Sequence, residues 1–255
     1  MKITSAGFSD VGRKREMNED FLIMDNSLGL YIVADGMGGH SAGEIASKVA
    51  AQIIQKNFKN WVNNNTPLTE TYGVPDMTLS EGGNYLLSSI KLANRVIHEM
   101  SQEYTEYNGM GTTIVVLLVT PSTIITANVG DSSIYLIRGN SMGPLFKEHS
   151  MVAEQLEMGL ISEEEARVSP LRHIITRSLG TLDTVAVDVF ENDHMNNDRF
   201  LLCTDGLTDM VSNNEIFRIV KNGDTPEQIC QQLIYEANKK GGNDNITVSL
   251  VYINE

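Results

Sequence analysis

The chain has 255 residues, of which 41% are hydrophobic and 20% are charged. This composition is ordinary for a globular protein, and the length allows one large domain or two small ones. Asp and Glu outnumber Lys and Arg by 33 to 19, which gives a formal net charge of −14. Nucleic acids and anionic membranes are bound through clustered positive charge, so this balance argues against both as partners.

The first residues, Met1 to Ser5, include no apolar stretch of the kind that a signal peptide carries. No run of the chain approaches the roughly 20 apolar residues that a membrane helix needs, so we expect a cytoplasmic protein. The two cysteines, Cys203 and Cys230, form neither a disulfide framework nor a zinc motif. Cys203 lies in an apolar run, which favours buried free thiols.

The N-terminal part is predicted to contain strands followed by two long helices. Strand-like apolar runs occur at Lys2–Ser9, Phe21–Met24 and Leu30–Ala34. Apolar residues recur at helical spacing in Ala42–Phe58 and in Tyr85–Met100, so each helix should lay an apolar stripe against a sheet. Between the two helices, Asn63 to Gly83 is rich in Gly and Pro and is expected to be a surface loop.

In the middle of the chain a hairpin precedes a segment of different character. Strands are expected at Thr113–Val119, Thr123–Val129 and Ser133–Arg138. The first two are separated by the tight turn Thr120-Pro121-Ser122, which predicts an antiparallel hairpin. From about Lys147 to Gly180 the pattern changes to short helical pieces. A capping-box signature from Ser162 to Glu165 opens one of them and Ser169-Pro170 ends it, which indicates a small inserted subdomain.

The C-terminal part is predicted to contain further strands and one well-delimited helix. The strands are expected at Val185–Phe190, Arg199–Thr204 and Ile246–Ile253. The last one alternates apolar residues with Thr247 and Ser249, which is typical of a strand with one face in a core. The helix Pro226–Lys240 has Thr225 as a plausible N-cap and proline in its first turn.

Five short acidic segments stand where strand-like runs begin or end. They are Asn18-Glu19-Asp20, Asp35-Gly36-Met37-Gly38-Gly39, Gly130-Asp131-Ser132, Thr204-Asp205-Gly206 and Asn243-Asp244-Asn245. Any one of them could be a plain turn, because Asp-Gly is a common turn dipeptide. Ionised carboxylates held together are costly unless cations neutralise them, and Mg²⁺ and Mn²⁺ prefer oxygen ligands. Taken together, the five segments therefore predict a shared site for divalent metals.

Two other kinds of site are excluded by spacing. The glycine-rich segment from Asp35 to Gly39 lacks the Gly-Lys-Ser/Thr ending of a nucleotide P-loop and the spacing of a dinucleotide-binding fingerprint. The acidic residues also do not follow the spacing of an EF-hand, so a calcium-buffering loop is not indicated.

The order of the motifs resembles the metal-dependent protein phosphatase family (PPM, or type 2C), in particular its bacterial members, almost from end to end. The motifs are Gly12-x-x-Arg15-x-x-Asn18-Glu19-Asp20, Val33-Ala34-Asp35-Gly36-Met37-Gly38-Gly39-His40, Gly109-Met110-Gly111-Thr112-Thr113, Asn128-Val129-Gly130-Asp131-Ser132, Leu202-Cys203-Thr204-Asp205-Gly206-Leu207 and Gly242-x-Asp244-Asn245-Ile246-Thr247. The resemblance implies an α+β fold, a four-layer α-β-β-α sandwich of two packed antiparallel sheets flanked by helices. It also implies a single domain over residues 1–255 whose inserted subdomain, about 147–180, is the flap of the family; we call these residues the flap segment.

The resemblance further implies a ligand set for two Mn²⁺ or Mg²⁺ ions and an optional third. Asp35 would bridge the two ions, with Asp205 and Asp244 completing one of them. Glu19 and the carbonyl group of Gly36 would serve the other ion, directly or through water. Asp20 would orient metal-bound waters from behind the ligands, and residues matching Asp131 and Asp205 would hold the third, weaker ion.

Two further residues receive roles from the resemblance. Arg15 is assigned to the substrate phosphate, because a guanidinium group offers a bidentate fork to phosphate oxygens. Without the motif it would be taken for a surface arginine in the run Arg13-Lys14-Arg15. His40 has three open interpretations: a general acid, a partner of a metal ligand, or a residue that merely begins the following helix. His98, His149, His173 and His194 are interpreted as surface or hydrogen-bonded core residues.

The chain departs from the family pattern at three places outside the expected metal ligands. Met37 stands where some eukaryotic relatives have a histidine, and Ser133 replaces a common arginine. The run from Ser169 to His173 replaces the His-Pro-x-Arg-Asn that is often seen in bacterial flaps. The differences at Ser133 and at Ser169 to His173 put flap contacts and substrate preference in doubt, whereas catalysis should survive them.

The leading hypothesis is a protein phosphatase that hydrolyses phosphoserine and phosphothreonine by one-step attack of a metal-bridging hydroxide. One alternative is a phosphatase of small phosphomonoesters, and another is a catalytically silent regulatory binding module. As partners we expect phosphorylated proteins and an opposing Ser/Thr kinase, and we expect the chain to be a monomer.

Overall fold

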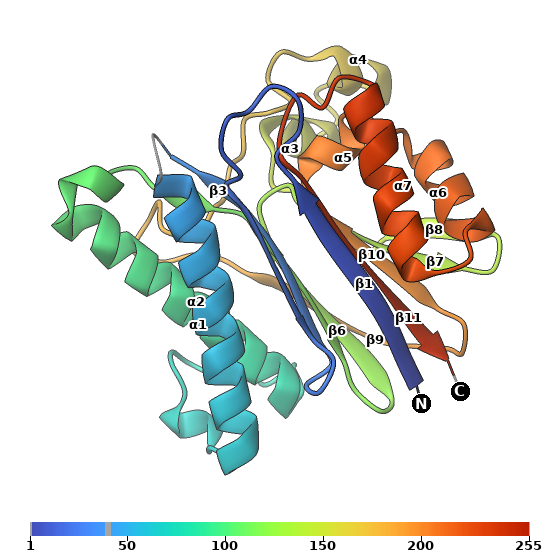
Figure 1. Ribbon diagram of the computed structural model, residues 1–255. Coiled ribbons are helices and arrows are strands. Elements are labelled where there is room, and N and C mark those ends of the chain that lie inside the picture. Colours follow the sequence, from blue (N-terminus) through green and yellow to red (C-terminus); the bar gives the residue numbers. More distant parts are fainter. Residues whose placement is uncertain (1, 39–41, 255) are drawn as a thin grey trace.

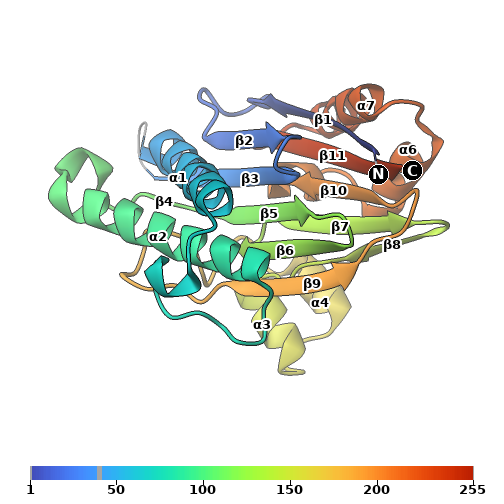
Figure 2. The same ribbon diagram turned by 90° about the horizontal axis from the view of Figure 1, so that it is seen from below.

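A computed structural model describes residues 2–38 and 42–254 of the chain. Two antiparallel β-sheets pack face to face, and helices cover the outer face of each sheet (Figures 1 and 2). The expected α-β-β-α sandwich is confirmed.

The first sheet joins the two ends of the chain. Its strand order is β1-β11-β10-β7-β8. The strands are β1 (Lys2–Asp10), β7 (Ser133–Arg138), β8 (Ser141–Pro144), β10 (Arg199–Cys203) and β11 (Ile246–Asn254). Lys2 pairs with Asn254 in the antiparallel register of β1 and β11, so the two termini lie side by side (Figure 1).

The second sheet contains the predicted hairpin. Its order is β2-β3-β5-β6-β9, and a short strand β4 pairs with β3. The strands are β2 (Asp20–Asp25), β3 (Leu30–Met37), β4 (Gly111–Thr112), β5 (Ile114–Val119), β6 (Thr123–Val129) and β9 (Asp188–Asp193). Val119 pairs with Ile124 across the turn, which confirms the hairpin. Every residue of β5 is buried, because packed layers cover both faces of this strand.

Long helices cover the two sheets on opposite sides. The second sheet is covered by α1 (Ala42–Asn64) and α2 (Glu81–Glu103), and the first by α6 (Asn213–Asn222) and α7 (Pro226–Lys239) (Figure 1). The Thr225 side chain accepts a hydrogen bond from the Gln228 backbone, which confirms the expected N-cap. The remaining helices are the 3₁₀ turns η1 (Leu68–Glu70) and η2 (Thr105–Tyr107), and α3 (Met151–Glu157), α4 (Glu163–Val168) and α5 (Asp205–Thr208).

Three apolar layers alternate with the sheets. The central layer lies between the two sheets and includes the buried side chains of Tyr31, Leu117 and Phe200. The outer layers lie under α1 and α2 on one side and under α6 and α7 on the other. The alternation predicted for the last strand is explained by this arrangement, since Leu250 belongs to an outer layer and Val251 to the central one.

The structure corrects several predicted boundaries and adds elements. The strand expected at Val185–Phe190 is displaced to Asp188–Asp193, because Val185 packs against the helix-covered core before pairing with β6 begins. The expected loop is shorter than Asn63–Gly83, since α1 continues to Asn64 and α2 begins at Glu81. The strands β4 and β8 and the helices α5 and α6 were not among the predicted elements.

The flap segment lies beyond one end of the sandwich, where α4 is labelled in Figure 1. The capping box between Ser162 and Glu165 is confirmed, and α4 ends before Ser169 as expected. The segment is fastened near its start, where the backbone amide of His149 donates to the Gly130 carbonyl at 3.0 Å. Within the described residues no helix is long and apolar enough to cross a membrane.

Candidate metal centre

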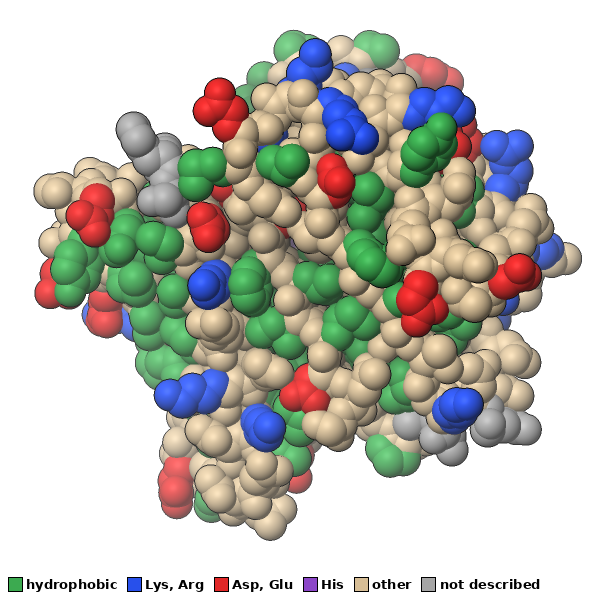
Figure 3. All heavy atoms as spheres, in the orientation of Figure 1, with side chains coloured by type: hydrophobic (Ala, Val, Ile, Leu, Met, Phe, Trp, Pro, Cys, Tyr) green, Lys and Arg blue, Asp and Glu red, His purple; other side chains and the backbone are tan. Residues whose placement is uncertain are grey.

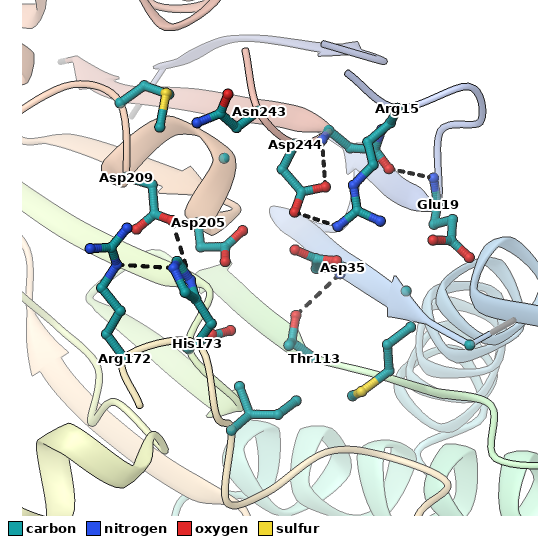
Figure 4. Close-up of a pocket in the computed structure, with 18 residues that line it drawn as sticks. Arg15, Glu19, Asp35, Thr113, Arg172, His173, Asp205, Asp209, Asn243 and Asp244 are labelled. Carbon is teal, nitrogen blue, oxygen red and sulfur yellow. Dashed lines mark hydrogen bonds and ion pairs between the residues drawn. The ribbon is translucent and has the colours of Figure 1, made fainter. Parts of the chain in front are cut away.

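The five acidic segments converge on one pocket at the end of the sandwich. A cavity of about 510 Å³ opens there between the strand ends and the flap segment (Figure 4). Its lining includes the acidic side chains that the sequence singled out, namely Glu19, Asp35, Asp131, Asp205 and Asp244, together with Arg15 and Gly36. Residues from positions 15 to 244 thus meet at one place.

Strand pairing explains why these carboxylates meet. Asp20 begins β2 and pairs with Asp35 near the end of β3. Asp205 follows β10 and Asp244 precedes β11, and these two strands are antiparallel neighbours. Asp131 follows β6 in the other sheet. Since all of these strand ends lie at the same edge of the two packed sheets, the register alone brings their side chains together.

Asn245 holds the first acidic segment in place. Its side-chain oxygen accepts a hydrogen bond from the Glu19 backbone amide at 2.8 Å. Its side-chain nitrogen donates to the carbonyl groups of Val11 and Met17 at 3.0 and 2.9 Å. An amide that is 4% exposed therefore ties the loop after β1 to the start of β11 and fixes where Glu19 stands.

Two glycines in the acidic motifs are required by close backbone approach. A Cβ atom at Gly36 would lie 2.1 Å from the Gly43 carbonyl oxygen and 2.6 Å from that of Glu19. A Cβ atom at Gly206 would lie 2.0 Å from the carbonyl oxygen of Asn245. Any side chain at these positions would push apart the segments that carry the carboxylates.

Several carboxylate oxygens of the acidic segments lack a hydrogen-bond partner within the described part of the chain, although Asp20 itself is not among the residues that line the pocket. They are Glu19 Oε1, Asp20 Oδ1 and Asp205 Oδ1, and all three are buried. The other oxygen of Asp20 accepts a hydrogen bond from the Thr204 hydroxyl at 2.9 Å. Buried carboxylate oxygens without donors are costly, and a divalent cation satisfies them. The residues present therefore fit hard divalent metal ions.

The electrostatics of the pocket also favour neutralisation of its carboxylates by positive charge. Burial, followed by the charges of Asp20 and Asp205, holds the pKa of Asp35 well above its ordinary value. Burial also raises the pKa of Asp20 to about 7 and that of Asp131 to about 6. The pKa of Asp205 is raised well above its usual range by burial and by the charges of Asp131 and Asp209. Without cations, protons would be drawn to the same carboxylates.

Arg15 stands at the rim of the pocket and pairs with an acidic side chain. Its Nη2 atom donates to Asp244 Oδ2 at 2.8 Å, and the arginine side chain is 50% exposed (Figure 4). The guanidinium group therefore lies beside the carboxylates with part of its donor surface open to solvent.

His40 lies outside the described residues, so its expected role is not tested.

The backbone amide of Asp35 donates to Thr113 Oγ1 at 3.1 Å, and the Thr113 hydroxyl shares a hydrogen bond of 2.7 Å with Ser132. Met37, at the position where some relatives have a histidine, also lines the pocket.

Three titratable residues of the pocket lining were not predicted as site residues. Arg172 and His173 come from the flap segment, and Asp209 follows α5 (Figure 4). The interpretation of His173 as a plain surface or core residue is therefore incomplete. Asp209 could have been found from its spacing, because it lies four residues after Asp205 and donates its backbone amide to the Asp205 carbonyl at 2.8 Å. Nothing in the local sequence placed His173 there.

The other described histidines have hydrogen-bond partners away from the carboxylates that line the pocket. His149 is buried, accepts a hydrogen bond from the Gly130 amide at Nδ1 and contacts Asp188 through Nε2 at 2.7 Å. His98 contacts the Gly180 carbonyl and His194 that of Thr120, each at 3.1 Å. These contacts agree with the structural interpretation of the three residues.

The fold and the site together define a class of four-layer α-β-β-α protein whose strand ends carry a cluster of carboxylates suited to divalent cations. A family model described as Protein phosphatase 2C matches residues 11–246. The chain belongs to this family, and it is 39% identical over 247 residues to a protein of Listeria monocytogenes named Serine/threonine phosphatase stp. That alignment covers 95% of this chain and 93% of the relative.

Solved structures show the same architecture. The crystal structure of the Mycobacterium tuberculosis serine/threonine phosphatase PstP/Ppp superposes with a TM-score of 0.86 at 28% identity, covering 99% of each chain. A structure of the PstP catalytic domain in complex with 2 manganese ions superposes with a TM-score of 0.83, also at 28% identity and 99% coverage of each chain. These relatives are bacterial serine/threonine phosphatases, and one of the solved structures is a complex with 2 manganese ions.

The raised pKa of Asp20 predicts how the stability of the metal-free protein depends on pH. The folded state holds this proton up to about pH 7, whereas the ordinary pKa is 3.8. The stabilisation is therefore complete below about pH 4 and is lost as the pH rises through about 7. Asp20→Asn keeps an oxygen acceptor for Thr204 but cannot titrate. In the presence of a chelator, the free energy of unfolding of the wild type should fall relative to that of Asp20→Asn as the pH rises from about 4 to about 7.

Urea denaturation of both proteins at a series of pH values measures the difference. Curves that stay parallel from about pH 4 to about pH 8 would show that Asp20 keeps an ordinary pKa in the folded protein.

Proposed function

We propose that this protein is a divalent-metal-dependent phosphatase that hydrolyses phosphoserine and phosphothreonine in other proteins. The observation that carries the proposal is the group of buried carboxylate oxygens without donors, beside Arg15 in one open pocket. Family membership supports the same conclusion, because the relatives are named serine/threonine phosphatases.

The arrangement of the carboxylates supports a ligand set for two Mn²⁺ or Mg²⁺ ions. Asp35 would bridge the two ions. It is the carboxylate that the charges of Asp20, Asp205, Asp131 and Asp244 surround, and these charges raise its pKa. We assign Asp205 and Asp244, which come from neighbouring strand ends, to one ion.

The second ion is assigned to the opposite side of the pocket. Glu19 and the carbonyl group of Gly36 would hold it, and the Gly36 amide donates to the Glu19 carbonyl at 3.1 Å, so the two residues are fixed together. Asp131 with Asp205 remains the proposed holder of a weaker third ion.

When bound, divalent cations supply water that is ionised at neutral pH and offset negative charge on phosphoryl oxygens. The chain contributes positioning. Asp20 has one oxygen held by Thr204 and the other without a donor, so it is suited to accept a proton from a nearby water and orient it. We infer that hydrolysis is a single displacement at phosphorus without a phosphorylated enzyme.

Arg15 is suited to hold the substrate phosphate. Its pairing with Asp244 involves an arginine that is 50% exposed and a carboxylate that is 35% exposed. Pairs this exposed contribute only about 0–1 kcal/mol to stability, so exchanging part of the contact for a phosphate dianion costs little. A phosphate can accept two parallel hydrogen bonds from the guanidinium group, and as a dianion it carries a higher charge than the carboxylate.

A protein substrate is favoured over a small phosphomonoester by the setting of the pocket. It is bordered by Arg172, His173 and Ile175 of the flap segment, and the peptide around a phosphoserine would contact these side chains. On the face viewed in Figure 3 basic side chains lie scattered among acidic ones.

We further infer that the chain is one phosphatase domain with residues 147–180 as its flap. We infer that it is a monomeric and cytoplasmic enzyme and that a Ser/Thr kinase opposes it.

Rates on phosphothreonine peptides and on a panel of small phosphate monoesters separate these two substrate classes. With Mn²⁺ present, kcat/KM should be higher for the peptides, because only they can contact the flap segment. Uniformly higher values for the small esters would favour a small-molecule phosphatase instead.

Replacing the proposed bridging ligand tests the metal-dependent mechanism. Asp35→Asn substitutes a neutral amide for the carboxylate, so Mn²⁺-dependent hydrolysis of an aryl phosphate should fall at least about a thousandfold. Mn²⁺ binding, measured by calorimetry, should weaken in parallel. Glu191→Gln, on β9, is a matched control and should retain activity; near-normal turnover by Asp35→Asn would rule out a bridging role.

Arg15 is tested by comparing it with a neighbour in the same basic run. Arg15→Ala should raise KM for a phosphopeptide by about tenfold to a hundredfold, because a charge-assisted contact of about 1.5–3 kcal/mol is lost. Arg13→Ala removes a charge two residues away and should leave KM close to that of the wild type. Equal kinetics for the two variants would show that another residue holds the phosphate.

A further inference from the structure

Another cavity, of about 340 Å³, opens at the end of the first sheet where β11 finishes (Figure 1). Arg199 on β10 pairs with Tyr252 on β11 and with Ile137 on β7, so these three side chains form a row on one face of the sheet. Ile137 and Tyr252 belong to the apolar layer under α6 and α7, and all three residues line the cavity. Lys221, in the last turn of α6, lines it from the helix side.

This cavity is separate from the metal centre. Arg199 begins β10, whereas Asp205 lies beyond the other end of that strand. The 5 residues of β10 span about 17 Å at the usual rise of a strand. Within the described part of the chain, no residue lines both cavities.

The charge of the cavity is opposite to that of the chain as a whole. The chain has a formal net charge of −14, yet the described lining contains two cations, Arg199 and Lys221, and no Asp or Glu. The full described lining is Ile137, Gly139, Asn197, Arg199, Lys221, Tyr252 and Asn254. None of the ion pairs found among the described residues includes Arg199 or Lys221. Two cations that line one cavity without carboxylate partners attract an anion.

Neutral groups hold both cations in place. Arg199 Nη1 donates a hydrogen bond to the Val220 carbonyl, and Arg199 Cζ lies 4.4 Å from the centroid of the Tyr252 ring. Lys221 Nζ donates to Asn140 Oδ1. A guanidinium group has five N–H donors and an ammonium group has three, so each cation has further donors beyond these contacts.

The hydroxyl group of Tyr252 indicates that an acceptor is missing. Tyr252 is 8% exposed, and its hydroxyl oxygen has no hydrogen-bond partner within the described residues. Burial raises the pKa of Tyr252 to about 12, so the hydroxyl keeps its proton at neutral pH and can donate it in a hydrogen bond. A buried hydroxyl without a partner is destabilising. Its presence beside two cations points to an acceptor that the described residues do not supply.

We propose that Arg199, Lys221 and Tyr252 form a site for a phosphate group, either free phosphate or a phosphate monoester of a small molecule. The donors come from β10, β11 and α6, and a tetrahedral phosphate presents oxygens in several directions, whereas a carboxylate presents two in one plane. Arginine is well suited to phosphate oxygens. The volume is near the lower end of the roughly 300–1,000 Å³ of small-molecule sites, so the ligand is small. The proposal does not rest on the metal centre.

Equilibrium dialysis of the full chain against radiolabelled inorganic phosphate, with a chelator present, tests the site. Lys221→Ala should raise the Kd for phosphate by about tenfold to a hundredfold, because a charge-assisted contact is lost. Tyr252→Phe removes a neutral donor and should raise the Kd by at least about threefold. The control Lys239→Ala removes the same charge from α7 and should bind phosphate as the wild type does.

Urea denaturation gives a second readout and separates a ligand contact from a structural role. Without phosphate, Tyr252→Phe should be at least as stable as the wild type, because the variant lacks the buried hydroxyl. Phosphate should raise the urea midpoint of the wild type and of Lys239→Ala more than that of Tyr252→Phe or Lys221→Ala. A lower midpoint of Tyr252→Phe without phosphate would show that the hydroxyl serves the fold, which would overturn its assignment to a ligand.

A comparison of inorganic phosphate with adenosine monophosphate distinguishes the two sources of the phosphate group. A Kd at least about tenfold lower for the monoester would support a small phosphorylated molecule as the ligand, and an equal or higher Kd would support free phosphate.

Equal phosphate affinity of the wild type and Lys221→Ala would overturn the site. Loss of phosphate binding in Arg15→Ala instead would place the phosphate in the metal pocket and would overturn it as well. Because a chelator is present throughout, these outcomes are independent of metal-dependent hydrolysis, and their failure would leave the proposed function standing.

Discussion

The whole structure depends on holding mutually repelling carboxylates together where the strands of two sheets end. Asp20 and Asp35 are placed opposite each other by the register of β2 and β3, and Asp205 and Asp244 lie just beyond the paired ends of β10 and β11. The backbone cannot relax to separate them, because Asn245 and the close contacts at Gly36 tie the segments together. The repulsion therefore has to be met by cations or protons rather than by movement.

This constraint links stability to chemistry. A pocket that raises the pKa of Asp20 to about 7 has strong affinity for positive charge of any kind, and divalent ions satisfy several oxygens at once. The same negative field would repel a phosphate dianion, so a fixed cation at the rim is needed. In the proposed mechanism Arg15 would provide it, and because its partner Asp244 belongs to the cluster, substrate recognition and metal binding would share a residue.

The sequence predicted the parts of this arrangement that depend on local patterns. The hairpin at Pro121, the capping box at Ser162 and the acidic segments at strand ends follow from periodicity and turn chemistry. The strand β9 was misplaced because Val185 packs against the helix-covered core. The local sequence pattern does not distinguish such an apolar residue from one in a paired strand. His173 was missed because its neighbours in space, Asp205 and Asp209, lie more than thirty residues away in the chain. The roles of the ligands came from family resemblance rather than from spacing.

The position of β11 has a consequence for how the protein is made. This strand lies between β1 and β10, so residues synthesised late in this domain are inserted beside residues synthesised early in it. Until β11 emerges, β1 has no strand partner in its sheet, and Asp244 and Asn245 cannot reach Glu19. Such distant pairing makes folding slow relative to local contacts. A chain in which β11 and Asp244 have not yet been synthesised consequently holds an incomplete set of the proposed metal ligands and would have no hydrolytic activity.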